Sequence, residues 1–158
     1  MYNRLIKLEF FRVMPLVLVA IIMAGGLAVA ATNTTQAASE NLLGQGMVQL
    51  QGKNYLQAIK LLEQSVVANP ANAQSYSYMG RSYQEVGNAD RAYKYYDIAL
   101  TIDPEERKAL SWSGEVDAVD KEMDLAAEKL AKLERICGSE CAEYQYLQSA
   151  INKTKTDK

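Results

Sequence analysis

The stretch Ala73–Glu106, AQSYSYMGRSYQEVGNADRAYKYYDIALTIDPEE, contains the pattern that decides the fold. Gly87-Asn88 predicts a turn in its middle, so we expect two helices joined as a hairpin. The second helix should end at Asp103-Pro104, because a residue before proline is pushed out of the α region. Its apolar residues have the spacing of one buried helix face. These residues are Ala92, Tyr95, Tyr96, Ala99 and Ile102.

Small residues and prolines recur at one constant period along the chain. The columns are Gly46, Gly80 and Gly114; Ala58, Ala92 and Ala126; and Pro70 and Pro104. Large apolar residues form two more columns with the same step, which are Leu42, Tyr76 and Leu110, and Leu62, Tyr96 and Leu130. Two helices of a hairpin approach closely only where a side chain is small, so we expect the glycine column on the first helix and the alanine column on the second to supply that gap. A larger residue there would overpack the crossing by roughly 1–3 kcal/mol.

In these positions and in this period the chain resembles the tetratricopeptide repeat (TPR) family, whose units have about 34 residues. The second unit matches best, through Tyr76, Met79, Gly80, Tyr83, Ala92, Tyr96, Ala99 and Pro104. The first unit has polar Gln45 and Gln49 at usually apolar positions, and the third has Asp117 at another and Gly138 in place of a proline. The resemblance implies an all-α, right-handed α-solenoid of about three helix hairpins. Residues 39–106 would form two well-matched TPR units and residues 107–137 a third, degenerate one.

A C-terminal capping helix is expected over residues 139–153, because the last unit of a solenoid needs a lid with a polar outer face. The side expected to pack inward carries Cys141, Tyr144, Leu147 and Ile151. The side expected to face outward carries Glu143, Gln145, Gln148 and Asn152. The tail at residues 154–158 is polar, so we expect it to fray.

Residues 1–37 have the layout of a secretory signal peptide. Basic residues come first, and Val13–Ala31 then contains 19 residues without a charge. Cleavage fits after Ala30 or after Ala37, and we favour the second site because a polar run separates it from the apolar core. The alternative is an uncleaved anchor through residues 13–31, since about 20 apolar residues span a bilayer. We therefore expect a periplasmic or secreted protein, or one anchored in the inner membrane with its repeat domain outside the cytoplasm.

Composition excludes several classes of function. The 158 residues are 49% hydrophobic and 23% charged, as in an ordinary globular chain. A net charge of −2 gives no basic excess for nucleic acid. The chain has no histidine, which excludes Ser-His-Asp and Cys-His catalysis and His-ligated metals. We expect no enzyme, no cofactor and no metal site.

Cys137 and Cys141 are the only cysteines, and Gly138 between them permits a turn. In an exported protein the pair is expected to form a structural disulfide that attaches the capping helix to the last unit. Free buried thiols are the alternative. A thiol–disulfide enzyme is a remote one, because the spacing is not Cys-x-x-Cys and no thioredoxin-like strands surround it.

The resemblance also implies a concave face, lined by the first helix of each unit, that binds a peptide or helix of another protein. The family's positions fall on Leu43, Met47, Ser77, Tyr78, Arg81, Gln84, Lys108, Ser111, Trp112 and Glu115. Of these, Tyr78, Arg81 and Trp112 are of the types that anchor interfaces. Leu43 and Met47 replace polar groups of the clamp with which some members hold a partner's C-terminal carboxylate, so that mode is disfavoured. We expect an exported adaptor or assembly factor; the alternative is a membrane-tethered structural subunit that uses its convex face.

Overall fold

The computed structural model describes residues 34–156. The predicted signal or anchor lies almost entirely outside these residues. A helix long and apolar enough to cross a bilayer is not found within the described part of the chain. Residues 38–156 all belong to one compact unit.

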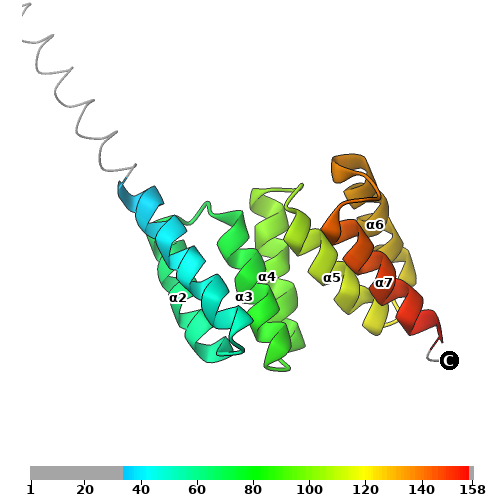
Figure 1. The fold of residues 1–158 in the computed structure, drawn as a ribbon, viewed down its shortest axis with the longest axis horizontal. Coiled ribbons are helices and arrows are strands. Elements are labelled where there is room, and N and C mark those ends of the chain that lie inside the picture. The colour runs from blue at the N-terminus through cyan, green and yellow to red at the C-terminus, as the bar shows by residue number, and fades with distance from the viewer. Residues whose placement is uncertain (1–33, 157–158) are drawn as a thin grey trace, which may run out of the picture. The chain divides into compact units, whose positions relative to one another are not determined.

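The described residues form helices joined by short turns, with no strand among them (Figure 1). A first helix occupies residues 34–51. It is followed by α2 (Tyr55–Ala68), α3 (Ala73–Glu85), α4 (Ala89–Ile102), α5 (Arg107–Val119), α6 (Met123–Cys137) and α7 (Ala142–Thr156). The prediction of an all-α helical solenoid is confirmed. The tail prediction was wrong in part, because α7 includes residues 154–156.

The loop residues explain where the helices begin and end. The side chains of Asn72 and Asn88 each accept a hydrogen bond from a backbone N–H three residues on, which caps α3 and α4. Helices α2 and α4 end just before Asn69 and Asp103, which have extended backbones as expected for residues that precede proline. The local sequence thus sets the hairpin boundaries.

The turns inside the hairpins share one backbone feature. Lys53, Gly87 and Lys121 all have a positive φ, of 60°, 78° and 68°. They are spaced by the period of the repeat, so the same left-handed turn closes each hairpin. Only the second unit places glycine there, the residue that adopts this conformation without steric cost.

The glycine column permits close packing. A Cβ on Gly46 would lie 2.8 Å from Leu62 Cγ, and one on Gly80 would lie 2.5 Å from Tyr96 Cε1. The side chains nearest to these two glycines therefore belong to the large apolar column. The Ala92 carbonyl oxygen lies 3.1 Å from a Cβ built on Gly80. The glycines supply the gap predicted for the crossing, and the side chains that fill it are large apolar residues.

The third hairpin departs from this arrangement. The three atoms nearest to a Cβ on Gly114 all belong to Leu147 of α7, with the closest at 2.7 Å. The corresponding residue of the return helix, Leu130, is only half-buried, whereas Leu133 and Leu147 are fully buried. Helix α7 therefore supplies the side chain that packs on the glycine of the third unit.

The polar residues of the first unit have a simple structural reason. Gln45 is exposed, and its side chain donates a 2.6 Å hydrogen bond to Asn41. In the second and third units the equivalent residues, Met79 and Ser113, are buried. The first unit has no preceding repeat among the described residues, so a glutamine at this position faces solvent. What looked like a weak match to the repeat is therefore an exposed position among the described residues.

Candidate functional site

One side of the compact unit is formed by the first helices of successive hairpins. Helix α3 packs against α5, and α5 packs against α7. Within the described residues, the backbones of α2, α4 and α6 lie close to neighbouring first helices and not to one another, although Lys129 Nζ of α6 lies 6.0 Å from the ring centroid of Tyr93 on α4. We call the surface formed by the first helix, α3, α5 and α7 the inner face.

An aromatic row crosses the inner face. Tyr78 on α3, Trp112 on α5 and Tyr146 on α7 stand at successive steps of the repeat period. The rings of Tyr78 and Trp112 meet edge to face, with centroids 5.1 Å apart. At the equivalent position of the first helix stands Gly44, where a Cβ would meet nothing within 4 Å. The row therefore borders open space at its end beside the helix of residues 34–51.

Tyr146 was missed by the sequence analysis, which treated α7 as a separate lid. The signal was present, because the same period continues from Leu110 to Tyr144 and from Trp112 to Tyr146. Helix α7 therefore occupies the place of the first helix of a fourth unit. Its glycine position holds Gln148, which is exposed.

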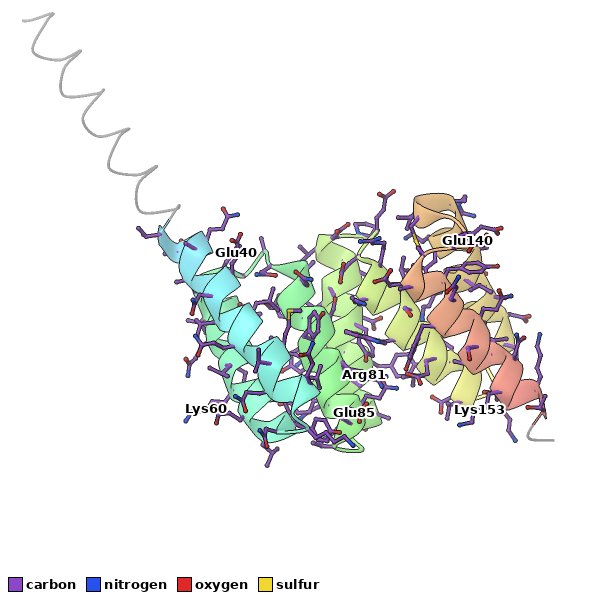
Figure 2. All side chains as sticks on the ribbon, viewed as in Figure 1. Glu40, Lys60, Arg81, Glu85, Glu140 and Lys153 are labelled. Carbon is purple, nitrogen blue, oxygen red and sulfur yellow. A yellow bond between two sulfur atoms is a disulfide. The ribbon has the colours of Figure 1, made fainter. Side chains whose placement is uncertain are left out.

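Arg81 lies beside this row and joins three helices. Figure 2 labels Arg81 and Glu85, which lie one turn apart on α3. The guanidinium of Arg81 is 2.7 Å from a carboxylate oxygen of Glu85 and 2.6 Å from one of Glu115 on α5. It also lies 5.8 Å from the ring centroid of Trp112 and 5.9 Å from that of Tyr146. Burial opposes the charge of Arg81, but Tyr146 and Glu115 outweigh it and raise its pKa. Arg81 is thus a fixed, neutralised cation.

Glu115 collects further donors on the same face. The side-chain amide of Gln84 donates a 3.0 Å hydrogen bond to it, and Gln84 in turn accepts one from the hydroxyl of Tyr96 at 2.7 Å. Burial, together with a hydrogen bond to Glu115, raises the pKa of Tyr146 to about 12. Tyr146 therefore stays a neutral donor at physiological pH.

A second charged cluster attaches α7 to α5. Lys108 Nζ lies 2.8 Å from a carboxylate oxygen of Glu143, and Arg107 lies 3.9 Å from the other. Burial opposes ionisation of Glu143, but the hydrogen bond from Lys108, a backbone hydrogen bond and the charges of Lys108 and Arg107 together outweigh it and lower the pKa. Ser111 Oγ donates to the backbone carbonyl of Glu143 at 3.0 Å. The expectation that Glu143 faces outward was wrong, because it is held by this cluster.

The predicted partner-binding residues divide by burial. Six of them are half-buried and have surface on the inner face, namely Met47, Arg81, Gln84, Lys108, Trp112 and Glu115. The other four are buried, namely Leu43, Ser77, Tyr78 and Ser111. Position in the repeat did not distinguish the two groups. Contacts with a neighbouring helix contribute to the burial, as for Ser111, which bonds to the backbone of α7, and Tyr78, which packs on the ring of Trp112. The partner-binding prediction is therefore corrected for the buried four, with Tyr78 serving to support Trp112.

A buried ion pair lies on the other side of α5. Asp117 is fully buried, and Lys129 of α6 donates to its carboxylate at 2.5 Å. The hydroxyl of Tyr93 on α4 donates to the other carboxylate oxygen. Burial and this hydrogen bond raise the pKa of Tyr93. Asp117, which looked like a defect of the third unit, connects three helices.

The cysteine sulfurs lie 2.07 Å apart, at bonding distance, with Cα atoms separated by 5.8 Å. A carboxylate oxygen of Glu143 lies within 4.8 Å of both sulfurs. Glu143 is already paired with Lys108, whose Nζ lies 2.8 Å from its carboxylate. We therefore assign no metal site to Cys137, Cys141 and Glu143.

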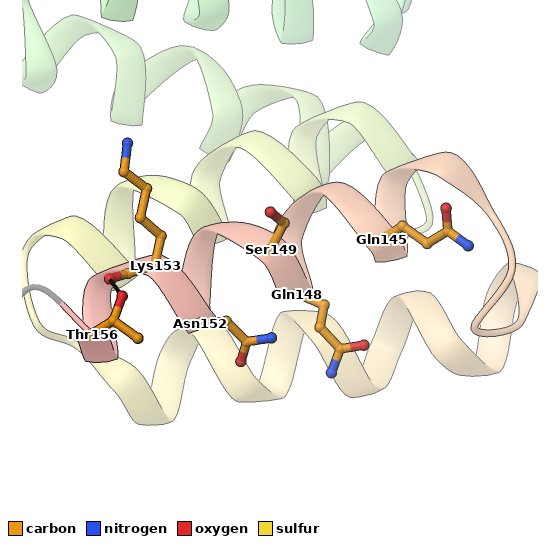
Figure 3. A pocket seen from close by; sticks show the side chains of 6 residues that line it. All are labelled: Gln145, Gln148, Ser149, Asn152, Lys153 and Thr156. Atoms are coloured by element: carbon orange, nitrogen blue, oxygen red, sulfur yellow. Dashed lines mark hydrogen bonds between the residues drawn. The ribbon is translucent and has the colours of Figure 1, made fainter.

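The remaining hollows are surface features of single helices. One lies on the outer side of α7 between Gln145, Gln148, Ser149, Asn152, Lys153 and Thr156 (Figure 3). All six of these residues have polar side chains, as expected for the end of a solenoid. Another lies on the first helix around Gly44 and Val48. Neither brings together the groups of a catalytic site.

Comparisons with known proteins relate the chain to TPR domains by fold. No protein-family model matches the sequence, and no curated protein does. Among solved structures, the Sgt2 TPR domain from Aspergillus fumigatus is similar with a TM-score of 0.65 and 24% identity, over 75% of this chain and 78% of that one. The first TPR of Spaghetti (RPAP3), bound to the HSP90 peptide SRMEEVD, is similar with a TM-score of 0.66 and 15% identity, over 77% of this chain and 94% of that one. The Yersinia enterocolitica type III secretion chaperone SycD, in complex with a peptide of the translocator YopD, is similar with a TM-score of 0.61 and 19% identity, over 75% of this chain and 92% of that one. Residues 38–156 therefore have a TPR fold.

Proposed function

We propose that this chain is a non-catalytic protein-interaction module, an exported adaptor or assembly factor that holds a peptide or helix of a partner protein on its inner face. The observation that carries the proposal is the convergence of Arg81, Trp112 and Tyr146 from three helices. Arginine, tryptophan and tyrosine dominate the binding energy of protein interfaces when they lie at the centre of a packed patch. Here they are held in place by neighbours and still keep exposed surface.

Two solved structures of the same fold support the choice of ligand. The RPAP3 domain binds an HSP90 peptide, and SycD binds a YopD peptide. A TPR fold can thus bind a short segment of another protein. The fold alone does not name the partner, so the side chains of the inner face must decide its chemistry.

We further propose that residues 1–37 direct export and are removed after Ala37. In support, the compact unit begins at Ala38, and Ser39 is already fully buried and hydrogen-bonded to Ser65 at 2.9 Å. Cleavage after Ala37 would therefore leave a chain that is folded almost from its first residue. In the oxidising compartment outside the cytoplasm, Cys137 and Cys141 would form a disulfide.

The intact mass of the protein purified from cells tests this processing step. A mass that begins at Ala38 is the expected result. A chain that keeps residues 1–37 would instead favour the alternative, a membrane-tethered structural subunit that contacts its complex through α2, α4 and α6.

The binding proposal is tested by affinity capture from the cell envelope, with a C-terminal tag. The test variant is Trp112→Ala/Tyr146→Ala, and Leu125→Ala is the control because this residue is 47% exposed on α6. Arg81→Glu is avoided, since a third carboxylate beside Glu85 and Glu115 would threaten the fold. We expect a partner that is recovered with wild type and with the control but lost with the double variant. Equal recovery with all three proteins would contradict binding at the inner face.

A further inference from the structure

We infer that the inner face selects an uncharged, apolar segment of its partner rather than an acidic chain end. This inference rests on the proposed function and specifies the chemistry of the ligand. It derives from how the charges around the aromatic row are arranged and from the surface that this arrangement leaves.

The cation at the centre of the inner face is already neutralised. Arg81 is paired at 2.6–2.7 Å with both Glu85 and Glu115. Its side chain is 20% exposed and that of Glu115 is 22% exposed, so water screens the pair only in part. A carboxylate from a ligand would have to displace one of these acids and would be repelled by the other.

Nearer the start of α5, Lys108 is committed in the same way, whereas Arg107 is 51% exposed and lies 3.9 Å from its acid. Lys108 is hydrogen-bonded to Glu143, whose carboxylate is also approached by Arg107. Glu106 adds another acid near Tyr78, and its Oε1 is buried without a hydrogen-bond partner. Breaking a partly buried pair leaves an uncompensated charge, which costs more than the new contact returns. An acidic ligand is therefore opposed at both ends of the aromatic row.

The surface that stays open is apolar and neutral. Tyr146 is 38% exposed, and Trp112 and Met47 are half-buried. Gly44 leaves space beside the row on the first helix. Aromatic and methionine side chains bind apolar segments through area and shape, without a counter-charge. A segment with aliphatic or aromatic side chains and no net charge fits this surface best.

The HSP90 peptide SRMEEVD, which is bound to the RPAP3 domain, contains three acidic residues and serves as an acidic probe of the inner face. Trp112 is the single tryptophan of the chain, so its fluorescence reports directly on the inner face. Titration of residues 38–158 with SRMEEVD should leave this fluorescence unchanged. A saturable change would overturn the inference.

The positive test is selection from a random peptide library displayed with blocked ends, using the wild-type protein and the Trp112→Ala/Tyr146→Ala variant in parallel. Circular dichroism must first show that the variant is folded; Trp112→Phe/Tyr146→Phe replaces it if it is not. We expect the wild type to enrich peptides that are rich in aliphatic and aromatic residues and uncharged. Their affinity should change by less than about twofold between low and high salt, since no ion pair forms.

The two other outcomes are distinguishable. Enrichment of acidic or basic peptides would overturn the inference and leave the proposed function intact. If the wild type enriches nothing beyond what the folded variant enriches, the inner face is not a peptide-binding surface, and the proposed function fails together with the inference.

Discussion

The second unit and the region after it place different side chains against the glycine of the repeat. In the second unit, Gly80 on α3 receives the ring of Tyr96 from its own return helix. In the region 107–156, Gly114 receives Leu147 from α7, and the buried carboxylate of Asp117 holds α6 through Lys129. Where the repeat signature is kept, a hairpin packs on itself. Where it is weakened, the hairpin still packs on itself, but the next helix supplies the side chain on the glycine and an ion pair adds to the contacts of α6.

The replacement has a functional consequence, because α7 brings Tyr146 and Glu143 to the inner face. Tyr146 reaches Arg81 on the second unit, and Glu143 pairs with Lys108. The degenerate region therefore completes the surface that the regular region begins. Variants that weaken one packing solution and spare the other test this difference between the two regions.

The largest effect is expected for Lys129→Met. Removing the lysine leaves the fully buried Asp117 without its counter-ion, which should cost about 3–5 kcal/mol in the free energy of unfolding. Urea denaturation of residues 38–158 measures this. The double variant Asp117→Leu/Lys129→Met should recover most of the loss, because an apolar pair needs no counter-charge. If the single variant were as stable as wild type, the ion pair would not hold α6.

The glycine positions should differ in their tolerance of alanine. At Gly80 the new Cβ would meet the stiff ring of Tyr96 at 2.5 Å, so we expect a loss of about 1–3 kcal/mol. At Gly114 it would meet the end of the flexible Leu147 side chain, so the loss should be smaller. Thermal unfolding of Gly80→Ala and Gly114→Ala compares them directly. Equal losses would show that the two contacts are equivalent.

The disulfide should stabilise only modestly, because it closes a loop of five residues. The chain-entropy relation gives about 2 kcal/mol for that length. Cys137→Ser should therefore lower the melting temperature under non-reducing conditions. The decrease should equal the one that reductant causes in the wild-type protein. A melting temperature that does not change would mean that the cysteines are not paired in the purified protein.

The hairpin turns offer a gain of stability. Lys121 closes the third hairpin with φ of 68°, where Gly87 stands in the second. Lys121→Gly should relieve a steric cost of about 1 kcal/mol. Gly87→Lys is the reciprocal variant and should lose a similar amount. Urea midpoints that move in the same direction for both would contradict this account of the turns.

The smallest effect is expected for Glu143 and depends on pH. Its pKa is lowered in the folded protein, so its ionised form adds stability above the unfolded pKa, and this is lost as pH falls through the folded pKa. Glu143→Gln should therefore destabilise near pH 7 and become neutral in acid. Melting curves of both proteins between pH 7 and pH 3 should converge; a gap that stays constant would assign the effect to packing.

Much of the fold could be predicted because it depends on local patterns. The spacing of Gly46, Gly80 and Gly114 defines the repeat, and the prolines after α2 and α4 mark where hairpins end. The roles of Gln45 and Asp117 could not be predicted. Gln45 is exposed, since no repeat packs on it among the described residues. Asp117 is tolerated because Lys129 reaches it from another helix. Both depend on the place of a residue in the folded solenoid rather than on its neighbours in the sequence.

The candidate site was predicted in outline and missed in one essential part. Repeat positions correctly brought Arg81, Trp112 and Glu115 together. They failed for Leu43 and Ser77, whose burial results from how closely the inner helices approach. Tyr146 was overlooked although it stands one repeat period after Trp112, because the glycine expected two residues later is replaced by Gln148.

The most direct test of the central claim is photo-crosslinking in cells, with a benzophenone side chain placed either at Tyr146 on the inner face or at Leu125 on α6. We expect a partner protein to be crosslinked from position 146 and not from position 125, at equal levels of the two proteins. A partner crosslinked from position 125 and not from position 146 would contradict the account and move the interaction to the opposite side of the solenoid.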